Sequence, residues 1–111
     1  MKHTRLADLP DLAVSHNDKI RKQVLVPYGQ TANITNLSIA RFPPGEIAYV
    51  HCHKDMSEVF LVQAGRAEIV IDGQLHPLSV GDCITVDAGE MHELRNTGTN
   101  ILEVLCLGVL V

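Results

Sequence analysis

Residues 45–65 read GEIAYVHCHKDMSEVFLVQAG, and this stretch decides the fold. Its fixed positions are Gly45-x5-His51-x-His53-x4-Glu58-x6-Gly65. Because successive side chains alternate across a strand, His51 and His53 point to the same face of any strand that carries both. We expect Glu58 on the next strand. The stretch therefore predicts two strands that bring two imidazoles and one carboxylate together.

A second stretch, residues 81–96, reads GDCITVDAGEMHELRN, with fixed positions Gly81-x7-Gly89-x2-His92-x3-Asn96. It predicts a later strand that carries His92. Side chains that converge from separate strands are not explained by local helix or turn chemistry. Three neutral imidazoles and one carboxylate suit a divalent first-row transition metal, Mn, Fe, Ni, Cu or Zn. We predict that the metal ligands are His51, His53, Glu58 and His92.

Together the two stretches resemble the two conserved motifs of the cupin superfamily. The first stretch fits at every fixed position, whereas the second departs at Asp87, where the family usually has proline. Asp87 starts a tight turn, for which aspartate is also suited. The resemblance implies an all-β fold, a double-stranded β-helix or jelly-roll β-barrel, in a small single-domain chain.

The pattern of apolar runs and turn residues along the chain fits this fold class. Short β-rich runs separated by turn signals begin at Gln23, which indicates a sandwich or barrel. Asp72-Gly73 is a two-residue hairpin signal, because glycine accepts positive φ without steric cost. We therefore predict an N-terminal arm over residues 1–22 and a barrel domain over residues 23–111. The expected strands are 23–27, 36–42, 47–53, 58–63, 66–71, 74–78, 83–86, 92–96 and 101–107.

Strand alternation also predicts which side chains line the barrel. If His51 points inward then Tyr49 does too, and if Glu58 points inward then Phe60 follows it. Tyr49 is thus our candidate for a catalytic hydrogen-bond donor beside the metal ligands, and filling of the core with the hydroxyl at the rim is the alternative. His3, His16 and His76 lie outside the pattern and are expected in solvent.

Composition limits the partners. The chain has 111 residues, enough for one core, and a net charge of −4 with no Trp and two each of Tyr and Phe. Without a basic stripe or stacking aromatics, nucleic-acid binding is not expected. No run reaches membrane-span length and no apolar run follows Lys2 and Arg5, so we expect no membrane partner, no signal peptide and a cytoplasmic location. Three cysteines without a CxxC pair are expected to be free thiols.

The apolar C-terminal run, residues 101–111, carries Glu103 as its only charge. Together with the outward positions Val59 and Leu61, it offers more apolar surface than one small barrel can bury. We therefore predict a homodimer.

The resemblance implies a metal-binding cupin but leaves the reaction open, and with it whether the chain is an enzyme. The leading hypothesis is a metal-dependent oxidoreductase, of dioxygenase type, that acts on a small chelating organic substrate. The second is an isomerase or lyase, decarboxylases included, whose metal acts as a Lewis acid on a carbonyl or sugar oxygen. The third is a small-molecule-binding module without turnover.

Overall fold

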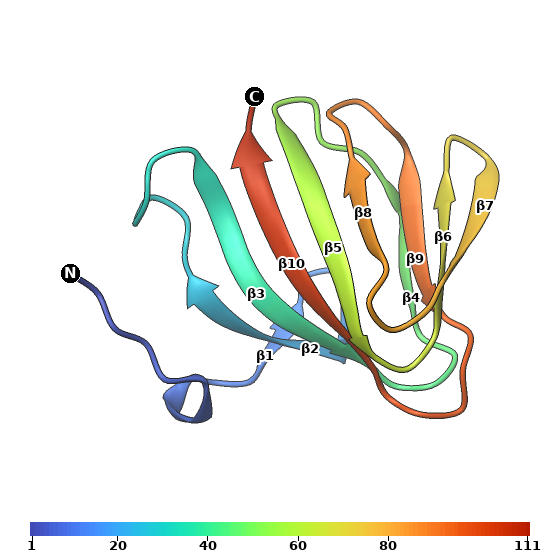
Figure 1. Cartoon of the computed structure of the whole chain (residues 1–111), viewed down its shortest axis with the longest axis horizontal. Coiled ribbons are helices and arrows are strands. Elements are labelled where there is room, and N and C mark those ends of the chain that lie inside the picture. Colours follow the sequence, from blue (N-terminus) through green and yellow to red (C-terminus); the bar gives the residue numbers. More distant parts are fainter.

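The computed structural model describes residues 1–111, which form ten strands and one short 3-10 helix. All strand pairs are antiparallel, and Figure 1 shows them gathered into two sheets. The elements are η1 (Leu6–Asp8), β1 (Leu12–Val14), β2 (Asn17–Val26), β3 (Ile34–Phe42), β4 (Ile47–His51), β5 (Met56–Ala64), β6 (Ala67–Ile71), β7 (Gln74–Leu78), β8 (Cys83–Val86), β9 (His92–Asn96) and β10 (Leu102–Leu110). One sheet has the order β1-β2-β3-β10-β5-β8 and the other β4-β9-β6-β7.

The core lies between the two sheets. Val62 and Val104 come from the six-stranded sheet, and Ile69 and Leu94 from the four-stranded one; all four are buried in one apolar cluster. On β5 the inward positions alternate as the sequence predicts, with Phe60 and Val62 buried and their neighbours partly exposed. The all-β jelly-roll barrel expected from the sequence is confirmed. None of its elements is a helix with the length and apolar character needed to cross a membrane.

The N-terminal part of the chain differs from expectation. Residues 12–22 do not form an irregular arm, because β1 and most of β2 lie there and β2 runs without a break across position 22. Ile20 is 1% exposed and belongs to the core. The segment was not recognised as a strand because it lies at the edge of the sheet, where charged residues such as Asp18 and Lys19 face solvent.

The hairpin between β6 and β7 is confirmed at Asp72-Gly73. Asp72 and Gly73 have φ of 46° and 82°, and they join the paired residues Ile71 and Gln74. The closing glycine of the first motif, Gly65, is required for a steric reason. A Cβ there would lie 2.6 Å from the carbonyl oxygen of Ile101, so only glycine fits where these two loops meet.

Strand β4 is shorter and less regular than the sequence predicts. It ends at His51, so His53 lies in the loop that leads to β5. Ala48 pairs with Leu94 and His51 pairs with His92, which leaves one extra residue on β4 between the two pairs. This is a β-bulge, and it reverses the alternation of side chains within the strand.

Candidate metal centre

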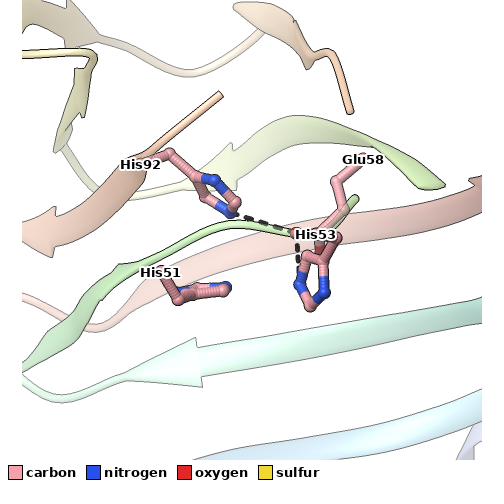
Figure 2. Close-up of side chains that lie close together, drawn as sticks. All are labelled: His51, His53, Glu58 and His92. Carbon is pink, nitrogen blue, oxygen red and sulfur yellow. Dashed lines mark hydrogen bonds and ion pairs between the residues drawn. The ribbon is translucent and has the colours of Figure 1, made fainter. Parts of the chain in front are cut away.

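The structure brings together all four predicted ligand side chains. His51 ends β4, His53 lies two residues beyond it, Glu58 is in β5 and His92 begins β9. One potential ligand atom from each residue lies within 4.8 Å of those of the others. Figure 2 shows the rings of His53 and His92 on two sides of the Glu58 carboxylate, with His51 beside them.

One carboxylate oxygen of Glu58 contacts two of the three imidazole rings. Glu58 Oε1 lies 3.0 Å from His92 Nε2 and 3.2 Å from His53 Nε2. The ring centroids of His51 and His92 are 4.3 Å apart. The ring nitrogens and the carboxylate oxygen therefore point into one small volume rather than outward to separate patches of solvent.

Backbone carbonyls fix the orientation of two rings. His51 Nδ1 lies 2.8 Å from the carbonyl oxygen of Tyr49, and His92 Nδ1 lies 3.1 Å from that of Glu90. Because a carbonyl oxygen only accepts, each Nδ1 carries a proton and donates it. In a neutral ring Nε2 is then unprotonated, which is the form that a metal binds.

This arrangement fits a divalent cation. With its proton on Nδ1, a neutral His92 would direct the Nε2 lone pair at the Glu58 oxygen, and the two would repel. The contact is favourable either when His92 gains a second proton or when a cation lies between the two groups. Three imidazoles and a carboxylate are a donor set for the divalent first-row metals. Closed structural zinc sites usually contain cysteine, which this cluster lacks.

The electrostatics of the metal-free cluster follow the first alternative. Burial disfavours the charged ring of His92, but the hydrogen bonds with Glu58 and the Glu90 carbonyl outweigh it and raise the pKa of His92 above its usual value. Burial acts to raise the pKa of Glu58 as well, yet the bond with His92 and the nearby charge of His53 hold it below its usual value.

His51 behaves differently from His92. Burial lowers its pKa against the hydrogen bond with the Tyr49 carbonyl, and the charge of His92 lowers it further. As the pH falls, His92 therefore gains its second proton before His51 does, and it does so next to Glu58.

The cluster opens into a cavity of about 250 Å³ inside the barrel. This is slightly below the range of drug-sized pockets, so it suits a small molecule. Phe42, Phe60 and Leu94 supply apolar walls, whereas Lys22, Asn36 and Ser38 lie among the lining residues contributed by β2 and β3.

Tyr49 does not line this cavity, and the expectation that its hydroxyl points inward is wrong. The side chain is 59% exposed, because the bulge in β4 turns Ala48 rather than Tyr49 toward the barrel. What Tyr49 offers the cluster is its backbone carbonyl, which holds the ring of His51.

One residue at the mouth of the cavity was missed by the sequence reasoning. His16 lies in the turn between β1 and β2, is exposed as expected, and yet lines the cavity with its ring centroid 5.8 Å from that of His51. No local signal marks it, because the contact depends on how β2 folds back over β4. His76 is exposed on β7, in agreement with expectation.

The remaining motif residues have structural roles. Asn96 is 3% exposed and donates hydrogen bonds to the carbonyl oxygens of Phe42 and Asn100. It thereby ties three segments together at the end of β9, as expected of a residue that bonds to a turn. All three cysteines are free, and burial raises the pKa of the Cys106 thiol to about 12, which makes it a poor nucleophile.

Comparison with known proteins agrees with the fold and the motifs. The family model described as "Cupin domain" matches residues 38–108. The "Oxalate-binding protein" of Thermotoga maritima is 31% identical over 71 residues, which cover 64% of this chain and 59% of that protein. "Protein SchB" of Streptomyces halstedii is 33% identical over 70 residues, which cover 63% of this chain and 49% of that protein. The matches thus span less than two thirds of either relative.

Solved structures extend the likeness to nearly the whole chain. The crystal structure of a "predicted oxalate decarboxylase" from Thermotoga maritima has a TM-score of 0.91 at 22% identity, covering 99% of this chain and 100% of that chain. A "sugar phosphate isomerase from a cupin superfamily" from Silicibacter pomeroyi has a TM-score of 0.83 at 20% identity, covering 97% and 75%. At these identities the likeness establishes the fold alone.

Proposed function

The chain belongs to the cupin domain family, and on that premise we propose that it binds one divalent transition metal through His51, His53, Glu58 and His92. We further propose that it is a metal-dependent oxidoreductase of dioxygenase type, acting on a small chelating organic substrate. The observation that carries the proposal is the convergence of three imidazoles and one carboxylate at one end of a barrel cavity. Four protein ligands would leave about two open positions in an octahedral shell, which could take a bidentate substrate, or one substrate atom and a second small ligand.

Different groups of the protein would have different roles at this site. A bound metal would supply a Lewis-acid and redox centre. The carbonyl oxygens of Tyr49 and Glu90 keep two rings in the tautomer that leaves Nε2 free. Glu58 offsets part of the dication's charge. The apolar walls at Phe60 and Leu94 exclude water from the substrate's carbon skeleton.

The test of this proposal begins with metal analysis. Protein purified without added metal should contain about one equivalent of Fe, Mn, Ni, Cu or Zn, and a redox role favours Fe, Mn or Cu. Oxygen uptake is then measured with a series of chelating acids, diketones and phenols. If the protein contains metal and converts a substrate without taking up oxygen, the result would favour the isomerase or lyase with a Lewis-acid metal instead.

A binding role without turnover is the second candidate. The observation that favours it is the 31% identity to a protein named for binding oxalate. In that case calorimetry would show affinity for small carboxylates, and neither oxygen uptake nor product would accompany it.

We also propose that the protein is a homodimer. Alternation on the central strands places partly exposed leucines and valines on the outer face of the six-stranded sheet. These residues are Leu37, Val59, Leu61, Leu105 and Leu107. Unpartnered apolar sheet faces of this kind mark interfaces.

Sedimentation velocity at micromolar concentration should therefore give a dimer. Leu105 pairs with Ile39 and Leu61 near the middle of the sheet, so Leu105→Arg should give a folded monomer. A monomeric wild-type protein would contradict the proposal. The cytoplasmic location expected from the sequence stays a prediction.

A further inference from the structure

Part of the cavity wall that β2 and β3 contribute is polar. We call it the β2–β3 wall and define it by Lys22 on β2 and Asn36 and Ser38 on β3, all of which line the cavity. The proposed chemistry at the metal end does not use these side chains. An inward-facing lysine on a barrel wall is unusual, because burying a cation away from water is unfavourable unless a partner compensates for it.

Lys22 has no such partner within the chain. It takes part in none of the five ion pairs of the structure, whereas Arg41, on the neighbouring strand, is paired with Glu103. Lys22 is registered against Ala40, whose side chain also lines the cavity. The ammonium group is thus available to an anion that enters the barrel.

Asn36 carries a second unused group. Its Oδ1 is buried and has no hydrogen-bond partner, and it is the only buried side-chain oxygen or nitrogen of the chain in that condition. A buried acceptor without a donor costs free energy, so such atoms commonly mark the place of a ligand or an ordered water. The group that Asn36 Oδ1 requires is a donor, such as a hydroxyl.

The register of the sheet sets the distance between Asn36 and the metal cluster. Gly108 on β10 pairs with Asn36 on one side and with Glu58 on the other, so the two residues stand two strands apart. At ~4.8 Å per strand their Cα atoms are about 9.6 Å apart. A molecule in the cavity can therefore reach both Asn36 and the metal cluster.

We propose that the β2–β3 wall is a second binding subsite, which holds a carboxylate at Lys22 and a hydroxyl at Asn36. This inference rests on the proposed function, since the metal would hold the near end of the same molecule. It names the substrate class as a hydroxylated dicarboxylic acid longer than oxalate, with one chelating end and one end bound by the wall. A neutral diketone or a simple phenol would leave Lys22 unpaired.

Tartrate and lactate form a matched pair of probes. Both present an α-hydroxycarboxylate that can chelate the metal, but only tartrate has a second carboxylate and hydroxyl for the β2–β3 wall. Loading with Zn²⁺, which has no redox chemistry, allows binding to be measured without turnover. We expect calorimetry on the Zn²⁺-loaded protein to give a Kd for tartrate at least about tenfold lower than for lactate.

The variants assign that difference to the wall. Lys22→Gln and Asn36→Ala should each weaken tartrate binding severalfold to about tenfold and leave lactate within about twofold of wild type. Lys19→Gln is the control, because Lys19 lies on the same strand, carries the same charge and is exposed on the opposite side. It should change neither affinity, and metal content and melting temperature of all three variants should match wild type.

Two results would overturn the inference in distinguishable ways. Equal affinities for tartrate and lactate, or an unchanged tartrate affinity in both wall variants, would remove the subsite and leave the metal site standing. Failure of the wild-type protein to bind Zn²⁺ at all would remove the proposed function and the subsite together.

Discussion

Strands β4 and β5 position the proposed metal ligands in different ways. β5 is a regular strand of nine residues whose inward side chains, Glu58, Phe60 and Val62, follow strict alternation. β4 has five residues and a bulge, and it supplies His51 at its last position and His53 from the loop beyond. Beside the cluster β5 is paired on both sides, since residues 58–61 pair with β10 and with β8 without a register shift.

This difference separates two kinds of ligand. The regular strand supplies the carboxylate, which is anchored in the core. The bulged strand and its loop supply two imidazoles at the exposed mouth, where His53 has 37% of its side chain exposed. Bulges are typical of places where a strand redirects a side chain toward a site. We infer that β5 holds Glu58 rigidly in place and that the bulge in β4 directs His51 and His53 toward it.

Lowering the pH should have the largest effect, because it protonates the two imidazoles from β4 and its loop, and His92, before it protonates Glu58 on β5. Free histidines titrate near pH ~6.5, and each must be neutral to bind metal, so protons compete for three ligands. Glu58 has a lowered pKa and remains a carboxylate at pH 5. Between pH 7.5 and pH 5 the metal affinity should fall by up to ~30-fold per histidine, so by up to roughly 10⁴-fold for the three histidines together, which exceeds the effect of any single substitution below.

The sign for folding stability follows from the same groups. Metal holds the neutral rings, so its stabilising effect is present above about pH 6.5 and is lost as the pH falls. In the protein without metal, the raised pKa of His92 stabilises the fold below about pH 6.5, and the lowered pKa of Glu58 stabilises it above about pH 4.3. Between these two pH values the stabilisation from the His92–Glu58 pair is therefore fully present. The difference in melting temperature between metal-loaded and chelator-treated protein should therefore narrow toward pH 5. A constant difference would contradict a three-histidine site.

Removing one ligand should have the next largest effect. His53→Ala takes one imidazole from the mouth, and we expect metal affinity to fall by ~100-fold or more, since even changes behind the ligands cost 10–100-fold. The barrel should persist, because His53 lies outside the core. His76→Ala, on exposed β7, is the control and should bind metal like wild type. Stoichiometric metal in His53→Ala, measured by elemental analysis, would show that the ligands are misassigned.

The regular part of the structure was the predictable part. Period-two alternation gave the inward side chains of β5 and β9 correctly, because their ladders run without interruption beside the cluster. The spacing of the two motifs predicted the four side chains that converge in the candidate metal centre. The fold class came from the same motifs and from the density of turn signals.

What sequence could not give depends on pairing between distant segments. The bulge in β4 is defined only against β9, so Tyr49 was placed on the wrong face. β1 has only three residues, and the first half of β2 carries charges suited to a sheet edge, so the sequence of this segment resembles that of an arm. His16 and Lys22 reach the cavity only because β2 folds against β3 and over β4, a register that no local pattern specifies.

A pair of identical substitutions measures how much each strand contributes to stability. Val62 on β5 is 1% exposed and Val50 on β4 is 57% exposed. Val62→Ala should lower the free energy of unfolding by about 2 kcal/mol, from lost apolar burial plus the cavity that remains. Val50→Ala should change it by less than ~0.5 kcal/mol. The free energy of unfolding is measured by chemical denaturation, in which the dependence on denaturant concentration should not change. Equal losses of stability in the two variants would mean that β4 packs as tightly as β5.

The smallest effect is expected at Tyr49, and it tests the bulge directly. If the hydroxyl took part in the site, Tyr49→Phe would reduce metal or substrate binding. In the bulged strand Tyr49 is 59% exposed and does not line the cavity, and the group that holds the ring of His51 is the backbone carbonyl, which the substitution leaves in place. We therefore expect metal affinity, substrate affinity and melting temperature to match wild type within error. A drop of several-fold in substrate binding by Tyr49→Phe would mean that β4 straightens when the cavity is filled, which returns Tyr49 to the inward position that strict alternation predicts.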